Sequence, residues 1–102
     1  MSVDTEVVID EKIKTIDKEP PKYNVIMLND DHTPIDWVIE ILKTIYRHSD
    51  SGAENITMTI HNEGSAVVGT YSYEIAEQKS IETINASRTN GFPLQLKIEE
   101  AK

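Results

Sequence analysis

The sequence predicts an α+β fold, in which strands and helices build one small layered domain. A short apolar segment at residues 23–28, a second segment at residues 66–71 and an alternating segment from Leu94 to Glu99 are typical of strands. Two further stretches, residues 34–47 and 73–89, carry helical signals. Because helical stretches separate the strands, hairpins alone cannot join them, and a layered α+β arrangement is expected.

The first helical stretch has a clear start and a regular apolar face. Thr33 is a favourable N-cap, Pro34 suits the first helical position, and Asp36 completes a capping box. We therefore expect a helix that ends near Arg47, where a cation suits the negative end. Its apolar residues recur at three- and four-residue spacing: Ile35, Val38, Ile41, Leu42 and Ile45.

Residues 53–61 carry signals of both a strand and a helix. Their large apolar side chains alternate with threonines, as in a strand with one buried face. Ala53, Ile56 and Ile60 alone fit one face of a helix, which Ser51 could cap. Local sequence leaves both interpretations open.

The second helical stretch has a weaker apolar pattern. Ser72 can cap its start, and Asn90 with Gly91 ends it. Its large apolar side chains are Ile75, Ile81 and Ile84. Another face carries only small side chains, at Ala76, Ser80, Thr83 and Ser87.

Composition indicates one small acidic domain in the cytoplasm. The 102 residues include 18 acidic and 10 basic side chains, and the net charge of -8 repels phosphate backbones. The chain has no cysteine, no apolar run long enough to span a membrane and no basic start typical of a signal peptide. We expect neither nucleic acid nor a membrane as a partner.

Residues 1–22 are expected to form a flexible extension, and residues 23–102 the folded core. Charges alternate with valine and isoleucine in the extension without a regular period, and Pro20 and Pro21 close it. The sequence thus predicts one domain with an N-terminal tail.

Residues 29–34, Asn-Asp-Asp-His-Thr-Pro, form the densest polar cluster. An EF-hand calcium loop starting there would need glycine where Pro34 stands. A catalytic metal site using Asp30, Asp31, His32 and the distant His61 has acceptable ligand types but no recognised spacing. Such junctions of strand and helix are favoured ligand sites.

Two further interpretations of the cluster need no metal. In one, Asp31 and Thr33 cap the helix and the rest is a solvated loop. In the other, Asn29, Asp30 and a neutral His61 supply three acceptors for an ammonium group, which has three donors. The residues alone leave these possibilities open.

The sequence of this polar cluster and its flanking segments resembles the ClpS family of Clp protease adaptors. The segment Tyr23–Pro34 is similar to the signature strand and loop of that family. His61 with Gly64, residues 74–79 and residues 91–94 match three further family motifs in the same order. The resemblance covers residues 21–100.

The resemblance implies a three-stranded antiparallel sheet packed against three helices, in the order β-α-α-β-α-β, similar to the C-terminal domain of a ribosomal stalk protein. Residues 53–61 should then be helical. It implies an adaptor, not an enzyme, without cofactor or metal. Such an adaptor binds N-degrons, proteins that begin with Leu, Phe, Tyr or Trp, and delivers them as a monomer to a ClpA-type AAA+ unfoldase that feeds ClpP.

The resemblance also implies site residues. Asn29, Asp30 and His61 would bind the substrate α-amino group, with Asp31 beside them. Ile35 and Thr57 stand where methionine is common, so the preferred first residue can differ. The expected pocket for the first side chain comprises Thr33, Ile35, Val38, Thr57, Ile60 and Leu94.

Glu74 and Lys79 match family positions that contact the unfoldase; read alone, they are ordinary surface charges on a helix. The alternative function is a module of the same fold that inhibits the unfoldase, or acts as its decoy, without delivering substrates.

Overall fold

The computed structural model describes residues 20–102, so the expected extension lies outside the described residues except for its last three positions. Within this part, three strands and three helices alternate in the expected order. Their bounds are β1 Tyr23–Leu28, α2 Ile35–Thr44, α3 Asp50–Glu63, β2 Ser65–Tyr71, α4 Tyr73–Thr89 and β3 Gln95–Glu100. None of these helices is long and apolar enough to cross a bilayer.

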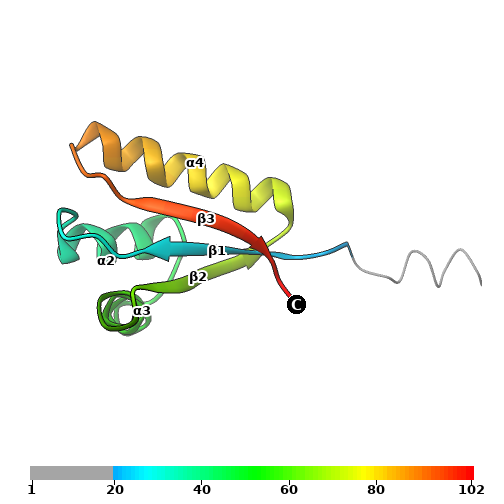
Figure 1. The fold of residues 1–102 in the computed structure, drawn as a ribbon, viewed down its shortest axis with the longest axis horizontal. Helices are drawn as coiled ribbons and strands as arrows, with labels where there is room; N and C mark the ends of the chain where they lie inside the picture. Colours follow the sequence, from blue (N-terminus) through cyan, green and yellow to red (C-terminus); the bar gives the residue numbers. More distant parts are fainter. Residues whose placement is uncertain (1–19) are drawn as a thin grey trace, which may run out of the picture.

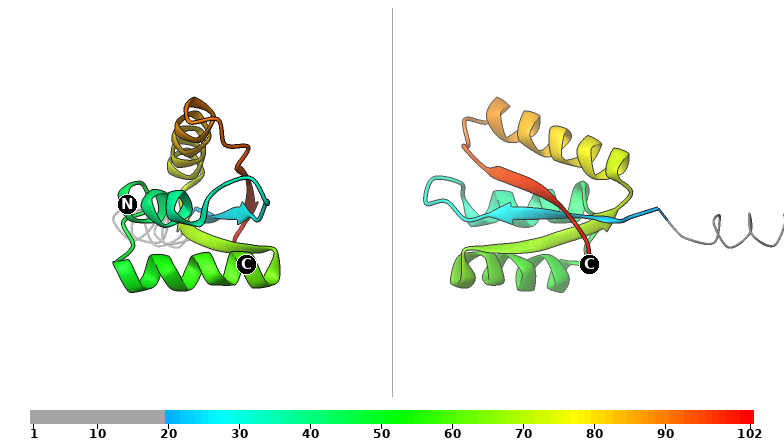
Figure 2. Two further views of the ribbon diagram at one scale, coloured as in Figure 1. Left: turned by 90° about the vertical axis from the view of Figure 1, so that its left-hand side faces the viewer. Right: turned by 45° about the vertical axis from the view of Figure 1, so that its right-hand side comes forward.

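The strands form one antiparallel sheet with β1 in the centre, in the order β2-β1-β3 (Figure 1). Val25 and Met27 of β1 are fully buried and face the helices, whereas their neighbours are only half-buried. Figure 2 shows α4 and α3 on opposite sides of α2. The α+β fold with a three-stranded antiparallel sheet and three helices is therefore confirmed.

A bulge interrupts the pairing of β1 with β2. Val25 pairs with Gly69 and Ile26 pairs with Val67, so Val68 is an extra residue without a partner on β1. Val68 is buried in the core, and its carbonyl accepts a hydrogen bond from His48 Nε2 at 2.6 Å. The bulge thus places the Val68 side chain in the core. The His48 side chain satisfies the Val68 carbonyl, which the bulge leaves without a partner on β1.

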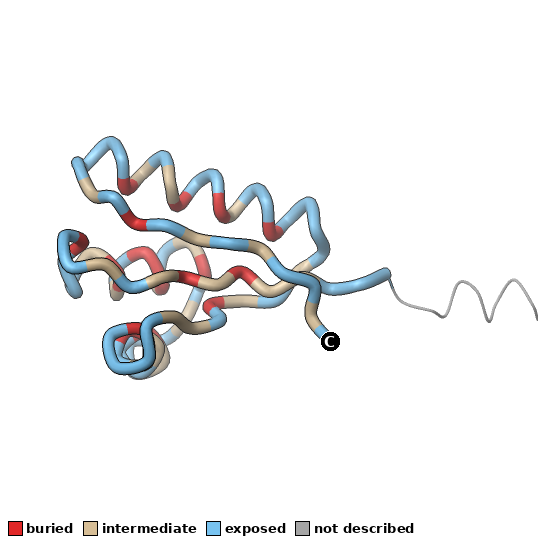
Figure 3. Tube along the Cα trace, in the orientation of Figure 1, coloured by how far each residue is buried: buried red, intermediate tan, exposed pale blue. Residues whose placement is uncertain are grey.

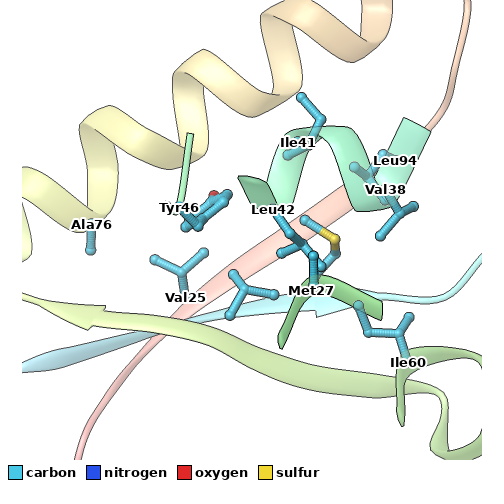
Figure 4. Packing of buried hydrophobic residues seen from close by; sticks show 11 residues of the cluster. Val25, Met27, Val38, Ile41, Leu42, Tyr46, Ile60, Ala76 and Leu94 are labelled. Atoms are coloured by element: carbon cyan, nitrogen blue, oxygen red, sulfur yellow. The ribbon is translucent and has the colours of Figure 1, made fainter. Parts of the chain in front are cut away.

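The core runs along β1 and has two distinct ends (Figure 4). Tyr46 and Ala76 lie at one end, and Val38, Ile60 and Leu94 lie at the other. We call the end with Tyr46 and Ala76 the tyrosine end, and the end with Val38, Ile60 and Leu94 the pocket end.

The structure corrects both boundaries of the first predicted helix. Pro34 is the N-cap rather than the first helical residue, and no side chain caps the helix. The amide and the hydroxyl of Thr33 both donate to Asp30, which holds Thr33 in the preceding loop. The helix ends at Thr44 rather than near Arg47, which adopts a left-handed conformation with φ 64°. Asp31, the other expected cap, is exposed and makes no recorded hydrogen bond within residues 20–102.

The ambiguous residues 53–61 lie inside α3, as the family resemblance implied. The cap is Ser49, whose side chain accepts from the Gly52 amide at 3.1 Å, and not Ser51. A strand would bury Met58 together with Ile56 and Ile60, but in the helix Met58 is 48% exposed. The buried face is instead formed by Ala53, Thr57 and Ile60.

Helix α4 packs through its small side chains, not its large ones. Figure 3 shows its buried positions on the side that faces the sheet, and they are Ala76, Ser80, Thr83 and Ser87. Ile75 and Ile81 are 43% and 53% exposed. Small residues let the helix backbone approach the sheet closely, which explains why the weak apolar pattern still gives a packed helix. The N-cap is Ser72, as expected, although its side chain makes no capping hydrogen bond.

The polar groups of the tyrosine end bond to one another. The Thr83 hydroxyl donates to the Lys79 carbonyl at 2.7 Å, so the Tyr46 hydroxyl donates to Thr83 at 2.9 Å. Lys79 Nζ donates to the Ile45 carbonyl at 2.7 Å and lies over the rings of Tyr46 and Tyr71. Ser80 Oγ is the exception, since it is buried without a hydrogen-bond partner in the described part of the chain.

Candidate functional site

A cavity of about 300 Å³ opens at the pocket end of the core. The end of β1, the start of α2, the end of α3 and the approach to β3 all contribute to it. Its volume lies at the lower limit of pockets that take small ligands. The lining residues are Leu28, Asn29, Asp30, Asp31, Thr33, Pro34, Ile35, Val38, Thr57, Ile60, His61 and Leu94.

All ten residues expected at the amine site and the side-chain pocket line this one cavity. Sequence reasoning missed Leu28 and Pro34 as lining residues. Both flank the polar cluster directly, so their place beside it was the available signal. The cavity brings together residues from four segments of the chain, but the lining alone does not assign a role to any of them.

Asp30 organises the loop between β1 and α2. Its Oδ1 accepts from the backbone amides of His32 and Thr33, each at 2.8 Å. Its Oδ2 accepts from the Thr33 hydroxyl at 2.7 Å. Since a carboxylate has about four lone-pair positions, one position on Oδ2 remains open for a further donor.

The same hydrogen bonds keep Asp30 ionised. Burial raises its pKa, but the bonds from Thr33 and His32, with the charge of His32, outweigh burial and hold the pKa below its usual value. The resulting stabilisation of the loop is complete above about pH 4 and is lost as the pH falls through the lowered value. Asp30 therefore carries a full negative charge at neutral pH.

Gly64 joins the polar loop to the end of α3. This glycine has φ 93°, a left-handed conformation that ends the helix, and its amide donates to the Ile60 carbonyl at 2.9 Å. Its carbonyl accepts from the Asn29 amide at 2.9 Å. The turn thus fixes Asn29 beside the last turn of α3, which carries His61.

The rim of the cavity is polar and its interior is apolar. Asn29, Asp31 and His61 are exposed, and their side chains make no recorded hydrogen bond to other residues of the described chain. Val38, Ile60 and Leu94 are 7%, 3% and 1% exposed and form the interior. This arrangement can hold a cation at the rim and an apolar group inside.

The two unusual pocket positions differ in their exposure. Thr57 is buried, and its hydroxyl donates to the Ala53 carbonyl at 2.7 Å within the helix, so its polarity is satisfied. Ile35 is 48% exposed and lies at the mouth of the cavity. A stiff, branched side chain at the mouth restricts which groups can enter.

The remaining expectations concern metals and the far side of the molecule. Within residues 20–102, no group of three or more acidic or histidine side chains is gathered as a metal site would require. Glu74 and Lys79 do not line the cavity. Glu74 is exposed in the first turn of α4, whereas Lys79 is half-buried by its contacts at the tyrosine end, and is thus no ordinary surface charge.

The fold and this cavity define a small α+β domain with an apolar pocket under an acidic rim. Comparison with known proteins identifies the group: the family of ATP-dependent Clp protease adaptor protein ClpS matches residues 18–97. The chain belongs to the ClpS family.

Individual relatives agree with the family match. The ATP-dependent Clp protease adapter protein ClpS of Nautilia profundicola is 44% identical over 96 residues, which are 94% of this chain and 97% of the relative. The protein of the same name from Treponema denticola is 44% identical over 80% of this chain and 81% of its own length.

A solved structure is similar to the whole described domain. It is Agrobacterium tumefaciens ClpS2 bound to L-phenylalaninamide, with 38% identity and a TM-score of 0.78. The similarity covers 81% of this chain and 100% of that chain. That protein thus binds an amino acid amide, which offers a free α-amine and an apolar side chain.

Proposed function

We propose that this chain is an N-degron adaptor: it binds proteins that begin with Leu, Phe, Tyr or Trp and delivers them to a ClpA-type AAA+ unfoldase for degradation by ClpP. The main observation in support of this proposal is the acidic rim over an apolar cavity of about 300 Å³. Membership of the ClpS family and the phenylalaninamide complex of the solved relative support the proposal.

In the proposed complex, the rim binds the α-amino group of the substrate. Asp30 accepts one N–H through the open position on Oδ2, and the Asn29 amide oxygen and a neutral His61 nitrogen accept the other two. Asp31 adds negative charge beside them. Charge-assisted hydrogen bonds contribute about 1.5 to 3 kcal/mol each, so the site distinguishes a free terminus from an internal residue.

The first side chain of the substrate enters the cavity between Val38, Ile60 and Leu94. Burying one Leu or Phe side chain contributes about 1.5 to 3 kcal/mol. Together with the amine contacts, and after the cost of ordering the peptide, this gives roughly micromolar affinity. Thr33, Ile35 and Thr57 complete the wall and shape the preference among first residues.

The test compares free and acetylated peptides. Fluorescent peptides beginning with Phe or Leu should bind, measured by fluorescence anisotropy, and the same peptides with an acetylated N-terminus should lose at least about tenfold in affinity, because acetylation removes the ammonium charge. Equal affinity for both forms would rule out the proposed recognition of the amine.

Delivery, the second part of the proposal, needs a surface away from the pocket. Glu74 and Lys79 on α4 are the proposed contacts with the unfoldase, and the chain itself breaks no bond. Since Lys79 already bonds the Ile45 carbonyl, Glu74 is the more available of the two. A degradation assay with the unfoldase, ClpP and a Phe-starting substrate should show faster turnover with the adaptor, and slower turnover contradicts delivery.

A further inference from the structure

A cluster of four residues ties α2 to the end of α4 beside the pocket. Trp37 Nε1 donates to the buried Ser87 Oγ at 3.0 Å across 50 residues of sequence. The Trp37 ring also meets the Phe92 ring edge to face, with centroids 5.4 Å apart. We call Trp37, Ser87, Arg88 and Phe92 the tryptophan cluster.

The C-terminus of α4 fixes the position of Phe92. The Phe92 amide donates to the Ser87 carbonyl at 2.8 Å, and the Gly91 amide donates to the Arg88 carbonyl at 2.9 Å. Gly91 has φ 80°, so the turn is a Schellman motif with glycine in the left-handed position. The turn therefore follows any movement of the last turn of α4.

Arg88 links the turn at the end of α4 to Leu94. Its Nη1 donates to the Phe92 carbonyl at 2.8 Å and to the Leu94 carbonyl at 2.9 Å. Leu94 is 1% exposed and lines the cavity. On the other side, Trp37 directly precedes Val38, another lining residue. The tryptophan cluster thus connects two walls of the pocket without touching its interior.

We infer that Trp37 and Ser87 are positioning residues that set the separation between Val38 and Leu94, and thereby the size of the first side chain that the pocket accepts. This inference rests on the proposed function and deepens it. Neither residue lines the cavity, so their effect acts through the two walls that they join.

The tyrosine end provides a matched control. Tyr46 and Thr83 form a hydrogen bond of 2.9 Å between the end of the α2 segment and the same helix α4. Tyr46 lies at the opposite end of the core from Val38 and Leu94 (Figure 4). Ser87→Ala and Tyr46→Phe each delete one hydroxyl that takes part in a bond between α4 and another segment, but only the tryptophan cluster adjoins the pocket.

The experiment measures dissociation constants of Ser87→Ala, Trp37→Phe and Tyr46→Phe for peptides that begin with Leu, Phe and Trp. In Ser87→Ala and Trp37→Phe the wall can move outward, so the ratio of the Trp constant to the Leu constant should fall about three- to tenfold. In Tyr46→Phe, all constants should change by the same factor. Urea unfolding checks that each variant is folded.

Three outcomes overturn the inference, and they are distinguishable. If the wild type binds the peptides but the ratio in both cluster variants stays within about twofold of the wild-type ratio, the cluster is only structural and the proposed function stands. If the wild type binds none of these peptides, the proposed function fails and the inference fails with it. A ratio that shifts as much in Tyr46→Phe also contradicts a role specific to the cluster.

Discussion

At the pocket end of the core, the side chains of Asn29, Asp31 and His61 face solvent, whereas at the tyrosine end the hydroxyls of Tyr46 and Thr83 bond to each other at 2.9 Å. Both ends carry polar groups beside apolar ones. At the tyrosine end, the amine of Lys79 is also occupied, by the Ile45 carbonyl. Polar groups that satisfy each other join elements of the fold, and those left facing solvent over a cavity are available to a ligand.

Asp30 combines both uses. It accepts three hydrogen bonds from its own loop and keeps one acceptor position open. Substitution there should therefore disturb both loop order and binding, whereas substitutions at the tyrosine end should change stability while the pocket keeps its selectivity.

The largest effect is expected for Asp30→Ala. Loss of the carboxylate removes an ion-paired acceptor and three loop contacts, so the affinity for a Phe-starting peptide should fall by about 100-fold or more. Fluorescence anisotropy measures the change. Asp31→Ala is the matched control: its exposed carboxylate forms no hydrogen bond or ion pair within residues 20–102, and its loss should cost less than about fivefold. Similar losses in both variants would contradict the special role of Asp30.

The next largest effect is expected at alkaline pH. Burial raises the pKa of Tyr46 to about 12, although its bond with Thr83 acts in the opposite direction. In the unfolded chain the pKa is about 10, so the unfolded state loses its proton first and stability falls as the pH rises from 10 to 12. The contribution of Tyr46 amounts to about 2 to 3 kcal/mol.

Urea unfolding of the wild type and Tyr46→Phe from pH 8 to pH 12 isolates this contribution. At pH 8 the variant should be less stable by about 1 kcal/mol, because one hydrogen bond is lost. The difference should shrink and reverse as the pH approaches 12. Tyr71, whose pKa burial also raises, remains in both proteins, so that only its electrostatic interaction with Tyr46 differs between them. A constant difference across this range would show that Tyr46 does not titrate as the fold requires.

The smallest effect is a gain in stability from Ser80→Ala. Among residues 20–102, Ser80 Oγ is buried without a partner, and alanine removes that desolvation cost and favours the helix. The free energy of unfolding should rise by about 1 kcal/mol, measured with urea. Thr83→Ala is the contrast, because Thr83 bonds to Lys79 and Tyr46 and its loss should destabilise. Destabilisation by both variants would mean that Ser80 is also paired.

The sequence predicts β1 better than it predicts the ends of α2. β1 matches its predicted range, Tyr23–Leu28, because a short apolar run bounded by polar residues has little alternative. The α2 boundaries fail at both ends, since Asp30 accepts from the amide and the hydroxyl of Thr33 and holds that residue in the loop, and Arg47 turns out of the helix. Capping signals identify candidate residues, but the bonds that these residues make to their neighbours decide where the helix begins.

Residues 53–61 and α4 show the limits of periodicity. The local pattern in α3 predicts a strand as well as a helix; the family motifs favour the helix, and the burial of Ala53, Thr57 and Ile60 shows which face packs in the core. In α4 the large isoleucines at 75 and 81 are exposed while small residues are buried. Hydrophobicity alone cannot predict which face of α4 is buried, because the space between the helix and the sheet accommodates only small side chains.

The sequence by itself determined most of the elements, the acidic charge and, through family motifs, ten of the residues that line the pocket. Those features depend on local backbone preferences and on short motifs that can be recognised in a single sequence. Only the tertiary structure decided that Asp30 holds its own loop, that Lys79 is engaged at the tyrosine end and that Trp37 reaches Ser87. These contacts join residues from separate elements or choose between competing partners, and their energies exist only once the chain has packed.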